Sequence, residues 1–152
     1  MRLLFVFIAL LISNSIFAVD PIINPATSQP ANGAINGSCL NFVMEFDNVT
    51  EVKQGAGETY VKNMDGTTHD TIDVATANVV INSPTTSVQV NLNTLLRPNT
   101  QYYINKDAGF VEETSSGDGS IGFTNNSTYS FTTGDGPNLN SSTPQTEQLT
   151  LE

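Results

Sequence analysis

Four acidic side chains lie close together in one stretch of the second half of the chain, and they are the residues best suited to binding a metal ion. They are Asp107, Glu112, Glu113 and Asp118, in a stretch rich in glycine. Hard cations such as calcium take several carboxylate and carbonyl oxygens from loops of this kind. The spacing differs from that of the EF-hand loop, so two interpretations stay open: a calcium site, or an acidic loop exposed to solvent. We favour the second, and expect no other cofactor.

Hydrolytic chemistry has little support in the sequence. A serine triad requires a histidine, and the one histidine, His69, lies in a polar stretch beside Asp70 with no spacing typical of a triad. Cys39, the single cysteine, would need the same histidine to act as a nucleophile. Glu112 and Glu113 are the right type for a glycosidase pair, but neighbouring residues of an extended strand point to opposite faces. We therefore expect no catalytic residues and no enzyme activity.

Composition excludes two classes of partner. Lys and Arg total 5 against 15 Asp and Glu, which gives a formal net charge of -10. Nucleic acid and anionic lipid would be repelled by this charge. Sugar-binding platforms commonly use exposed aromatic faces, and the chain has 4 tyrosines and no tryptophan. Protein contact or a structural role is therefore favoured over carbohydrate binding.

Residues 1–18 have the pattern of a secretory signal peptide. A short n-region with Arg2 precedes an apolar run over residues 3–12 and a polar-to-small exit. We expect cleavage after Ala18, with cleavage after Ser15 as the alternative. The apolar run is shorter than the roughly 20 residues of a membrane-spanning helix, so no transmembrane anchor is predicted. The protein is expected to be secreted, and to be extracellular, at the cell surface or in the periplasm.

Short alternating segments separated by turn residues predict an all-β fold. Residues 19–135 form the predicted domain, with its core in 25–135, and the polar residues 136–152 are predicted to be a disordered tail or linker. The length allows one domain, and the pattern predicts an immunoglobulin-like β-sandwich of about seven antiparallel strands. The predicted strands are Ser38–Phe46, Glu58–Asn63, Thr68–Val74, Val79–Ile81, Val88–Leu92, Tyr102–Asn105 and Thr128–Thr133.

Alternation also assigns side chains to faces. In the first predicted strand, Leu40, Phe42, Met44 and Phe46 are expected to point inward, and Cys39 to point away from the core.

The stretch Leu96-Arg97-Pro98-Asn99-Thr100-Gln101-Tyr102 predicts a tyrosine corner. In such a corner, a Tyr early in a strand bonds the upstream backbone, and the expected partner of Tyr102 lies near Leu95 or Leu96. Tyr102 is assigned inward and Tyr103 outward.

The order of five segments resembles a bacterial Ig-like domain, and more narrowly the SbsA-type Ig-like family, named after a surface-layer protein. Members of that family typically begin with Pro-x-x-Gly and end with Ser-Phe-Thr-Thr-Gly. The resemblance covers roughly residues 25–135, and departs after Phe46, where the family usually has Ser-Glu-Pro-Val. The segments that carry it are Pro30–Ala34, Phe42–Phe46, Leu96–Tyr102, Lys106–Phe110 and Tyr129–Asp135.

This resemblance implies a non-catalytic module of bacterial envelope or secreted proteins. The expected role is structural or adhesive, at the cell envelope or outside the cell, with other envelope or extracellular proteins, or glycans, as partners. The alternative is a small ligand-binding accessory such as a carbohydrate-binding module.

Overall fold

The computed structural model describes residues 19–35 and 37–135, and within them the chain forms ten β-strands and no helix. The predicted signal peptide over 1–18 and the predicted tail over 136–152 lie outside the described residues. Within the described part, no helix is long and apolar enough to cross a membrane.

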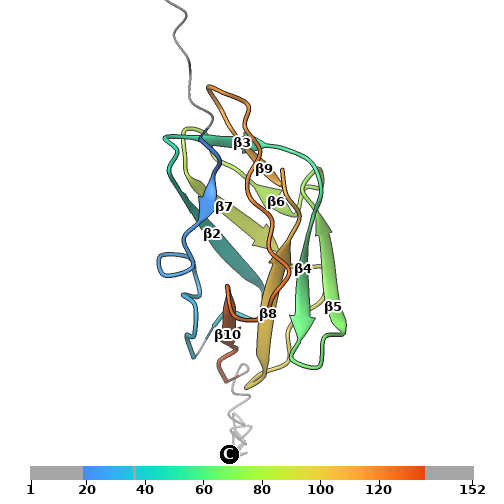
Figure 1. Cartoon of the computed structure of the whole chain (residues 1–152). Helices are drawn as coiled ribbons and strands as arrows, with labels where there is room; N and C mark the ends of the chain where they lie inside the picture. Colours follow the sequence, from blue (N-terminus) through green and yellow to red (C-terminus); the bar gives the residue numbers. More distant parts are fainter. Residues whose placement is uncertain (1–18, 36, 136–152) are drawn as a thin grey trace, which may run out of the picture.

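Two four-stranded antiparallel sheets form the body of the molecule (Figure 1). The first has the order β1-β2-β7-β6, and the second has the order β10-β8-β4-β5. The strands of the first sheet are β1 (Ile22–Ile23), β2 (Asn41–Asp47), β7 (Ser87–Asn91) and β6 (Val79–Val80). The strands of the second are β10 (Ser130–Thr132), β8 (Gln101–Lys106), β4 (Glu58–Asn63) and β5 (Thr68–Asp73).

A two-stranded ladder lies at one end of the molecule. It pairs β3 (Val52–Gln54) with β9 (Val111–Glu113), and Figure 1 shows it at the end where the described chain begins. Seven of the ten strands correspond to the predicted ones, and β1, β3 and β9 were not predicted. These three have only two or three residues each, too few to show a period.

The core lies between the two sheets, because buried side chains of both sheets belong to one cluster. Alternation along the strands explains which side chains are buried. In β2 every second residue is buried, and the residues between are partly exposed. The largest fully buried side chains are Tyr102, Tyr129, Phe42, Lys106, Phe110, Phe131, Met44, Ile72, Ile104, Val52, Val61 and Val74.

Two of the predicted face assignments before β2 are wrong. Leu40 is 61% exposed, and Cys39 is half-buried and packs against the core. The alternation fails here because the β-ladder begins only at Asn41. Upstream of it, the Ser38 hydroxyl oxygen accepts hydrogen bonds from the amides of Leu40 and Asn41, which folds the backbone into a turn.

Tyr103, which was assigned outward, is not among the residues of the core cluster, yet its side chain is only 8% exposed. Tyr103 lies on β8, where every residue after Gln101 is buried. The strand has neighbours on both sides, β10 and β4, and the backbone of Lys106 pairs further with Phe123. Beside this central strand, both faces are covered, so alternation distinguishes side-chain direction but not exposure.

The segment before β2 contacts both sheets. Its backbone pairs antiparallel with β2 at Gln29 and Val43, and then runs parallel to the last strand, with a bridge between Gly37 and Thr133. The first part of the chain therefore closes the edge of each sheet in turn.

Candidate functional site

The corner before β8 is held by side-chain bonds to one residue, Arg97. The backbone amide of Arg97 donates a hydrogen bond to Oη of Tyr102 at 3.0 Å, and its carbonyl accepts one from Oγ1 of Thr133 at 2.6 Å. A tyrosine corner is thus present, and its partner is upstream backbone next to Leu96, as predicted. The bonded group is an amide at position 97, one residue beyond Leu96, and the tyrosine oxygen is the acceptor.

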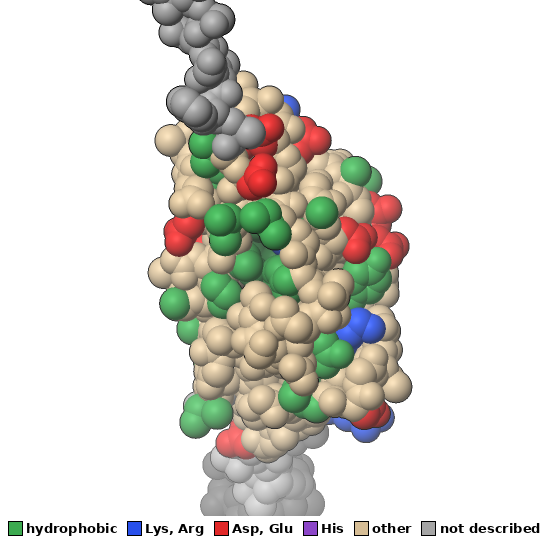
Figure 2. Space-filling model, viewed as in Figure 1, with side chains coloured by type: hydrophobic (Ala, Val, Ile, Leu, Met, Phe, Trp, Pro, Cys, Tyr) green, Lys and Arg blue, Asp and Glu red, His purple; other side chains and the backbone are tan. Residues whose placement is uncertain are grey.

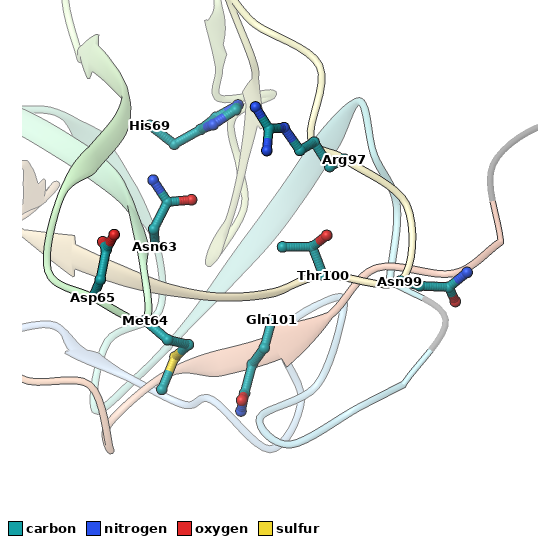
Figure 3. A pocket seen from close by; sticks show the side chains of 8 residues that line it. All are labelled: Asn63, Met64, Asp65, His69, Arg97, Asn99, Thr100 and Gln101. Carbon is teal, nitrogen blue, oxygen red and sulfur yellow. The ribbon is translucent and has the colours of Figure 1, made fainter.

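An open pocket of about 530 Å³ lies beside this corner (Figure 3). It is formed by the β4–β5 turn on one side and by the residues leading into β8 on the other. Three smaller pockets elsewhere on the described surface measure about 200 to 230 Å³. The larger pocket falls in the range of about 300–1,000 Å³ that small ligands occupy. It is lined by Asn63, Met64, Asp65, His69, Arg97, Asn99, Thr100 and Gln101.

His69 lines this pocket in a fixed orientation. Its Nε2 lies 3.2 Å from the carbonyl oxygen of Leu95, and its ring packs edge-on against Tyr102 with 5.3 Å between centroids. Since a carbonyl can only accept, the Nε2 atom carries a proton in this bond. In Figure 3 the His69 and Arg97 side chains extend toward one another across the pocket.

The neighbour of His69, Asp70, does not orient the histidine as a triad carboxylate would. Asp70 is 7% exposed, and its Oδ2 accepts hydrogen bonds from the amides of Asn93 at 2.7 Å and Thr94 at 3.1 Å. Asp70 therefore fixes the turn after β7 to the edge strand β5. Neither its carboxylate nor the half-buried thiol of Cys39 has a bond to His69 in the described part of the chain.

The four predicted calcium ligands are engaged at separate places. Asp107 Oδ2 accepts from the Glu58 amide at 3.0 Å, and Asp118 Oδ2 accepts from the Val19 amide at 3.1 Å. Glu112 forms an ion pair with Lys53 at 3.4 Å. Among residues 19–35 and 37–135, no group of three or more His, Cys, Asp or Glu side chains is placed to hold a metal ion.

The fourth of these carboxylates, Glu113, caps the turn that follows β9. Its Oε2 accepts from the Ser115 hydroxyl at 2.7 Å and from the Ser116 amide at 2.5 Å. The hydrogen bond from Ser115, followed by that from the Ser116 amide, lowers the pKa of the Glu113 carboxyl. Glu112 and Glu113 thus have different partners on different sides of β9, as expected for neighbours on a strand.

Lys106 is a buried cation that the sequence analysis did not identify. It is 1% exposed, and its Nζ donates to Ser120 Oγ at 2.8 Å, to the Ile121 carbonyl at 2.8 Å and to the Asp107 carbonyl at 3.1 Å. The Nζ atom also lies 5.7 Å from the centroid of the Phe46 ring. Burial lowers the pKa of Lys106 to about 8, and the nearby charge of Asp107 opposes this only in part. The sequence signal for its burial is the alternation along β8, which places Lys106 on the same face as Tyr102 and Ile104.

Two tyrosine hydroxyls have opposite environments. Tyr60 Oη donates to the Glu58 carboxylate at 2.9 Å and lies 3.3 Å from the Asp107 carboxylate. The pKa of Tyr60 is raised to about 12, chiefly by the hydrogen bond to Glu58 and next by burial. Tyr129 is fully buried, edge-on to Phe42 at 6.4 Å. Its hydroxyl has no hydrogen-bond partner in the described structure. Burial raises the pKa of Tyr129 as well.

Apolar side chains gather across the middle of one face of the molecule, while basic ones are few there (Figure 2). Among the exposed large apolar residues, Ile22 is 42% exposed and Ile121 is 50% exposed. The amide of Ile121 donates to the carbonyl of Pro21 at 3.2 Å, so these two segments lie side by side. Exposed apolar side chains that gather on one face in this way are typical of a contact area.

No protein-family model, curated protein or solved structure gives a significant match to this chain.

Proposed function

We propose that this protein is a secreted, non-catalytic Ig-like module with a structural or adhesive role at the bacterial cell envelope or outside the cell. The sheet orders support the Ig-like part of the proposal. The order β1-β2-β7-β6 corresponds to strands A-B-E-D of an immunoglobulin domain, and β10-β8-β4 corresponds to G-F-C, with β5 in the place of C′. The bond between Tyr102 and the Arg97 amide stands where such domains have their tyrosine corner, at the start of strand F.

The placement of the two ends of the described chain is the observation that carries the proposed role. Val19 lies at the end that holds β3 and β9, where its amide bonds Asp118. Asp135 lies at the opposite end, where its carboxylate accepts from Asn99 at 3.0 Å (Figure 1). A domain whose two ends lie at opposite poles can be held through one end while the other projects away, which suits a protruding structural or adhesive module.

The contact partner is proposed to be another envelope or extracellular protein. The apolar area around Ile22 and Ile121 supports this, as does the burial of three of the four tyrosines, Tyr102, Tyr103 and Tyr129, which removes their rings from sugar stacking. The SbsA-type resemblance points to the same class of protein.

Export and surface exposure can be tested together. The full-length chain, carrying a C-terminal epitope tag, would be produced in a bacterial host, fractionated and sequenced from its N-terminus. We expect a mature product that begins at Val19, found in the periplasm, at the surface or in the medium, and joined by crosslinking to envelope proteins. An unprocessed cytoplasmic product would contradict the proposal. A matched chain with Leu3→Arg and Leu10→Arg in the h-region should stay unprocessed.

The pocket beside Arg97 favours a second candidate function, a small ligand-binding accessory such as a carbohydrate-binding module. Its lining offers amide and hydroxyl groups together with one guanidinium. Sugars recognised here would be held by hydrogen bonds and charge rather than by stacking.

A further inference from the structure

Arg97 presents its side chain from a backbone that is fixed on both sides. Its amide and carbonyl are bonded to the Tyr102 and Thr133 side chains, and the Thr100 amide donates to Thr133 Oγ1 at 3.0 Å. The side chain itself is exposed and has no hydrogen-bond or ion-pair partner among the described residues. A fixed backbone with an unengaged guanidinium lowers the entropy lost when that group binds a ligand.

The opposite wall of the pocket is equally well fixed. The Asp65 carboxylate accepts from the amide and hydroxyl of Thr67 at 2.9 and 2.6 Å, and these bonds lower its pKa. The Asn63 amide donates to the Thr67 carbonyl at 2.9 Å, which closes the turn around Gly66, whose φ of 90° suits glycine. The ionised Asp65 carboxylate lines the pocket at the β4–β5 turn, so an anionic ligand would bind on the Arg97 side, away from this turn.

Among the Lys and Arg residues of the described ranges, Arg97 is the one whose side chain is exposed and has no bonded partner. The structure describes four of the five Lys and Arg residues. Lys106 is buried, Lys53 pairs with Glu112, and Lys62 donates to Thr68 Oγ1 at 2.9 Å. On a chain with net charge -10, an anion is attracted at few places, and this pocket has the Arg97 guanidinium in its lining.

The remaining lining groups suit a polyhydroxylated ligand. Asn63, Asn99, Thr100 and Gln101 carry both donors and acceptors, and the 44% exposed side chain of Met64 adds a small apolar surface. Of the strands that line the pocket, β4 and β8 have neighbours on both sides, and β5 is an edge strand that contributes His69 to the lining.

We propose that this pocket binds an acidic saccharide through the carboxylate of a uronic acid residue, which pairs with the Arg97 guanidinium while the neighbouring amides and hydroxyls bond the sugar hydroxyls. Arg97 forms a bidentate pair with a planar carboxylate, and this geometry discriminates against neutral sugars. The inference deepens the second candidate function and does not depend on the structural role. A failure of the binding test would leave the export and surface-exposure result unchanged.

The test is a calorimetric and NMR titration of the chain from Val19 onward with trigalacturonic acid, with neutral galactotriose as the matched ligand. We expect saturable binding of the acid only, with shifts at Arg97, Thr100 and Gln101. Arg97→Gln should weaken binding about ten-fold or more, since hydrogen bonds to charged groups are strong. Lys53→Gln removes the same charge outside the pocket and should leave Kd within about two-fold.

Four outcomes would overturn the proposal. These are the absence of binding at millimolar acid, equal binding of the neutral sugar, equal loss in the Lys53→Gln variant, and equal binding of a short peptide of aspartate and glutamate, which would make the carboxylate alone the ligand. Circular dichroism and thermal melting of the Arg97→Gln variant establish that its fold is intact. Arg97→Lys separates charge from bidentate geometry, and we expect it to recover only part of the affinity.

Discussion

The Oη atom of Tyr102 lies 3.0 Å from the backbone nitrogen of Arg97, and this bond joins the start of β8 to the corner that precedes it. Tyr102 is fully buried, so its ring serves the core while its hydroxyl fixes the corner. The pocket side chain of Arg97 depends on the same bond, because the residue is placed by its backbone. Tyr102 therefore contributes both to the stability of the core and to the position of a residue of the candidate binding site.

Tyr102→Phe should lower the free energy of unfolding by about 1–3 kcal/mol, because the Arg97 amide loses its acceptor while the ring still fills the core. Equilibrium denaturation in urea measures the change. If the phenylalanine variant were as stable as the parent, the hydroxyl would have no structural role at the corner.

Tyr129→Phe should behave in the opposite way. The Tyr129 hydroxyl is buried without a partner in the described structure, so its removal should leave the free energy of unfolding unchanged or raise it by about 1 kcal/mol. The same denaturation experiment serves, and the two variants are matched controls. A loss as large as that of Tyr102→Phe would mean that the hydroxyl has a bonded partner in solution.

Lys106 should make stability rise with pH across the mildly alkaline range. Its pKa is lowered from 10.5 to about 8 in the folded protein, so below pH 8 both states carry the charge and the cost of burying it is fully present. Above pH 8 the folded protein releases a proton that the unfolded chain keeps until about pH 10.5, and stability increases. Between about pH 7.5 and about pH 9.5 the gain should be about 2 kcal/mol.

The measurement is the free energy of unfolding as a function of pH, and its slope in the parent protein is compared with its slope in the Lys106→Met variant. The methionine variant should lose the rise, whatever its absolute stability. Measurements stop near pH 9.5 because Tyr60, with its pKa raised from 10.0 to about 12, favours the unfolded state once free tyrosine ionises above about pH 10. Parallel slopes in the two proteins would contradict the assignment to Lys106.

The register of β2 predicts unequal costs at two neighbouring positions. Phe42 is 1% exposed, while Val43 lies on the partly exposed face of the strand. Phe42→Ala should cost about 3–5 kcal/mol, and Val43→Ala should cost less than about 1.5 kcal/mol. Chemical denaturation distinguishes them, and equal costs would place both side chains in packed surroundings.

Calcium should not stabilise the protein specifically. Asp107, Glu112, Glu113 and Asp118 each have their own partners, and a true site would add roughly 2.7 kcal/mol at about 100 times its dissociation constant. Thermal melts with calcium and with magnesium, each at about 5 mM, should coincide, because charge screening treats the two ions alike. A shift with calcium alone, reversed by a chelator, would restore the calcium interpretation.

Sequence alternation predicted the strands where one face packs and the other meets solvent. Phe42, Met44 and Phe46 follow it because β2 pairs regularly with β7. Leu40 does not, because the Ser38 side chain bonds the backbone before the ladder begins. Strand β3 was missed because it exists only through its pairing with β9, about sixty residues away, which no local pattern contains.

The pocket could not be predicted, because it forms between two turns that are distant in the sequence. Asn63 and Arg97 become neighbours only when β4 and β8 pair. The burial of Lys106 could not be predicted for a different reason. Alternation accounts for its inward direction, but its Nζ atom bonds the Ser120 hydroxyl and the Ile121 carbonyl, which belong to another segment. A buried charged side chain needs hydrogen-bond partners, and only the folded arrangement supplies these acceptors.

Residues 33–35 and 37 lie beside the last strand in a parallel arrangement that has a mechanical consequence. Four backbone hydrogen bonds join the two: Gly33 N to Ser130 O, Thr132 N to Ala34 O, Gly37 N to Thr132 O and Gly134 N to Gly37 O. Because the two segments point the same way and the chain is pulled from opposite ends, tension acts along this ladder. The four bonds then resist in shear, all at once, instead of opening one after another as in a zipper. We expect single-molecule stretching between the two ends to meet its main resistance here.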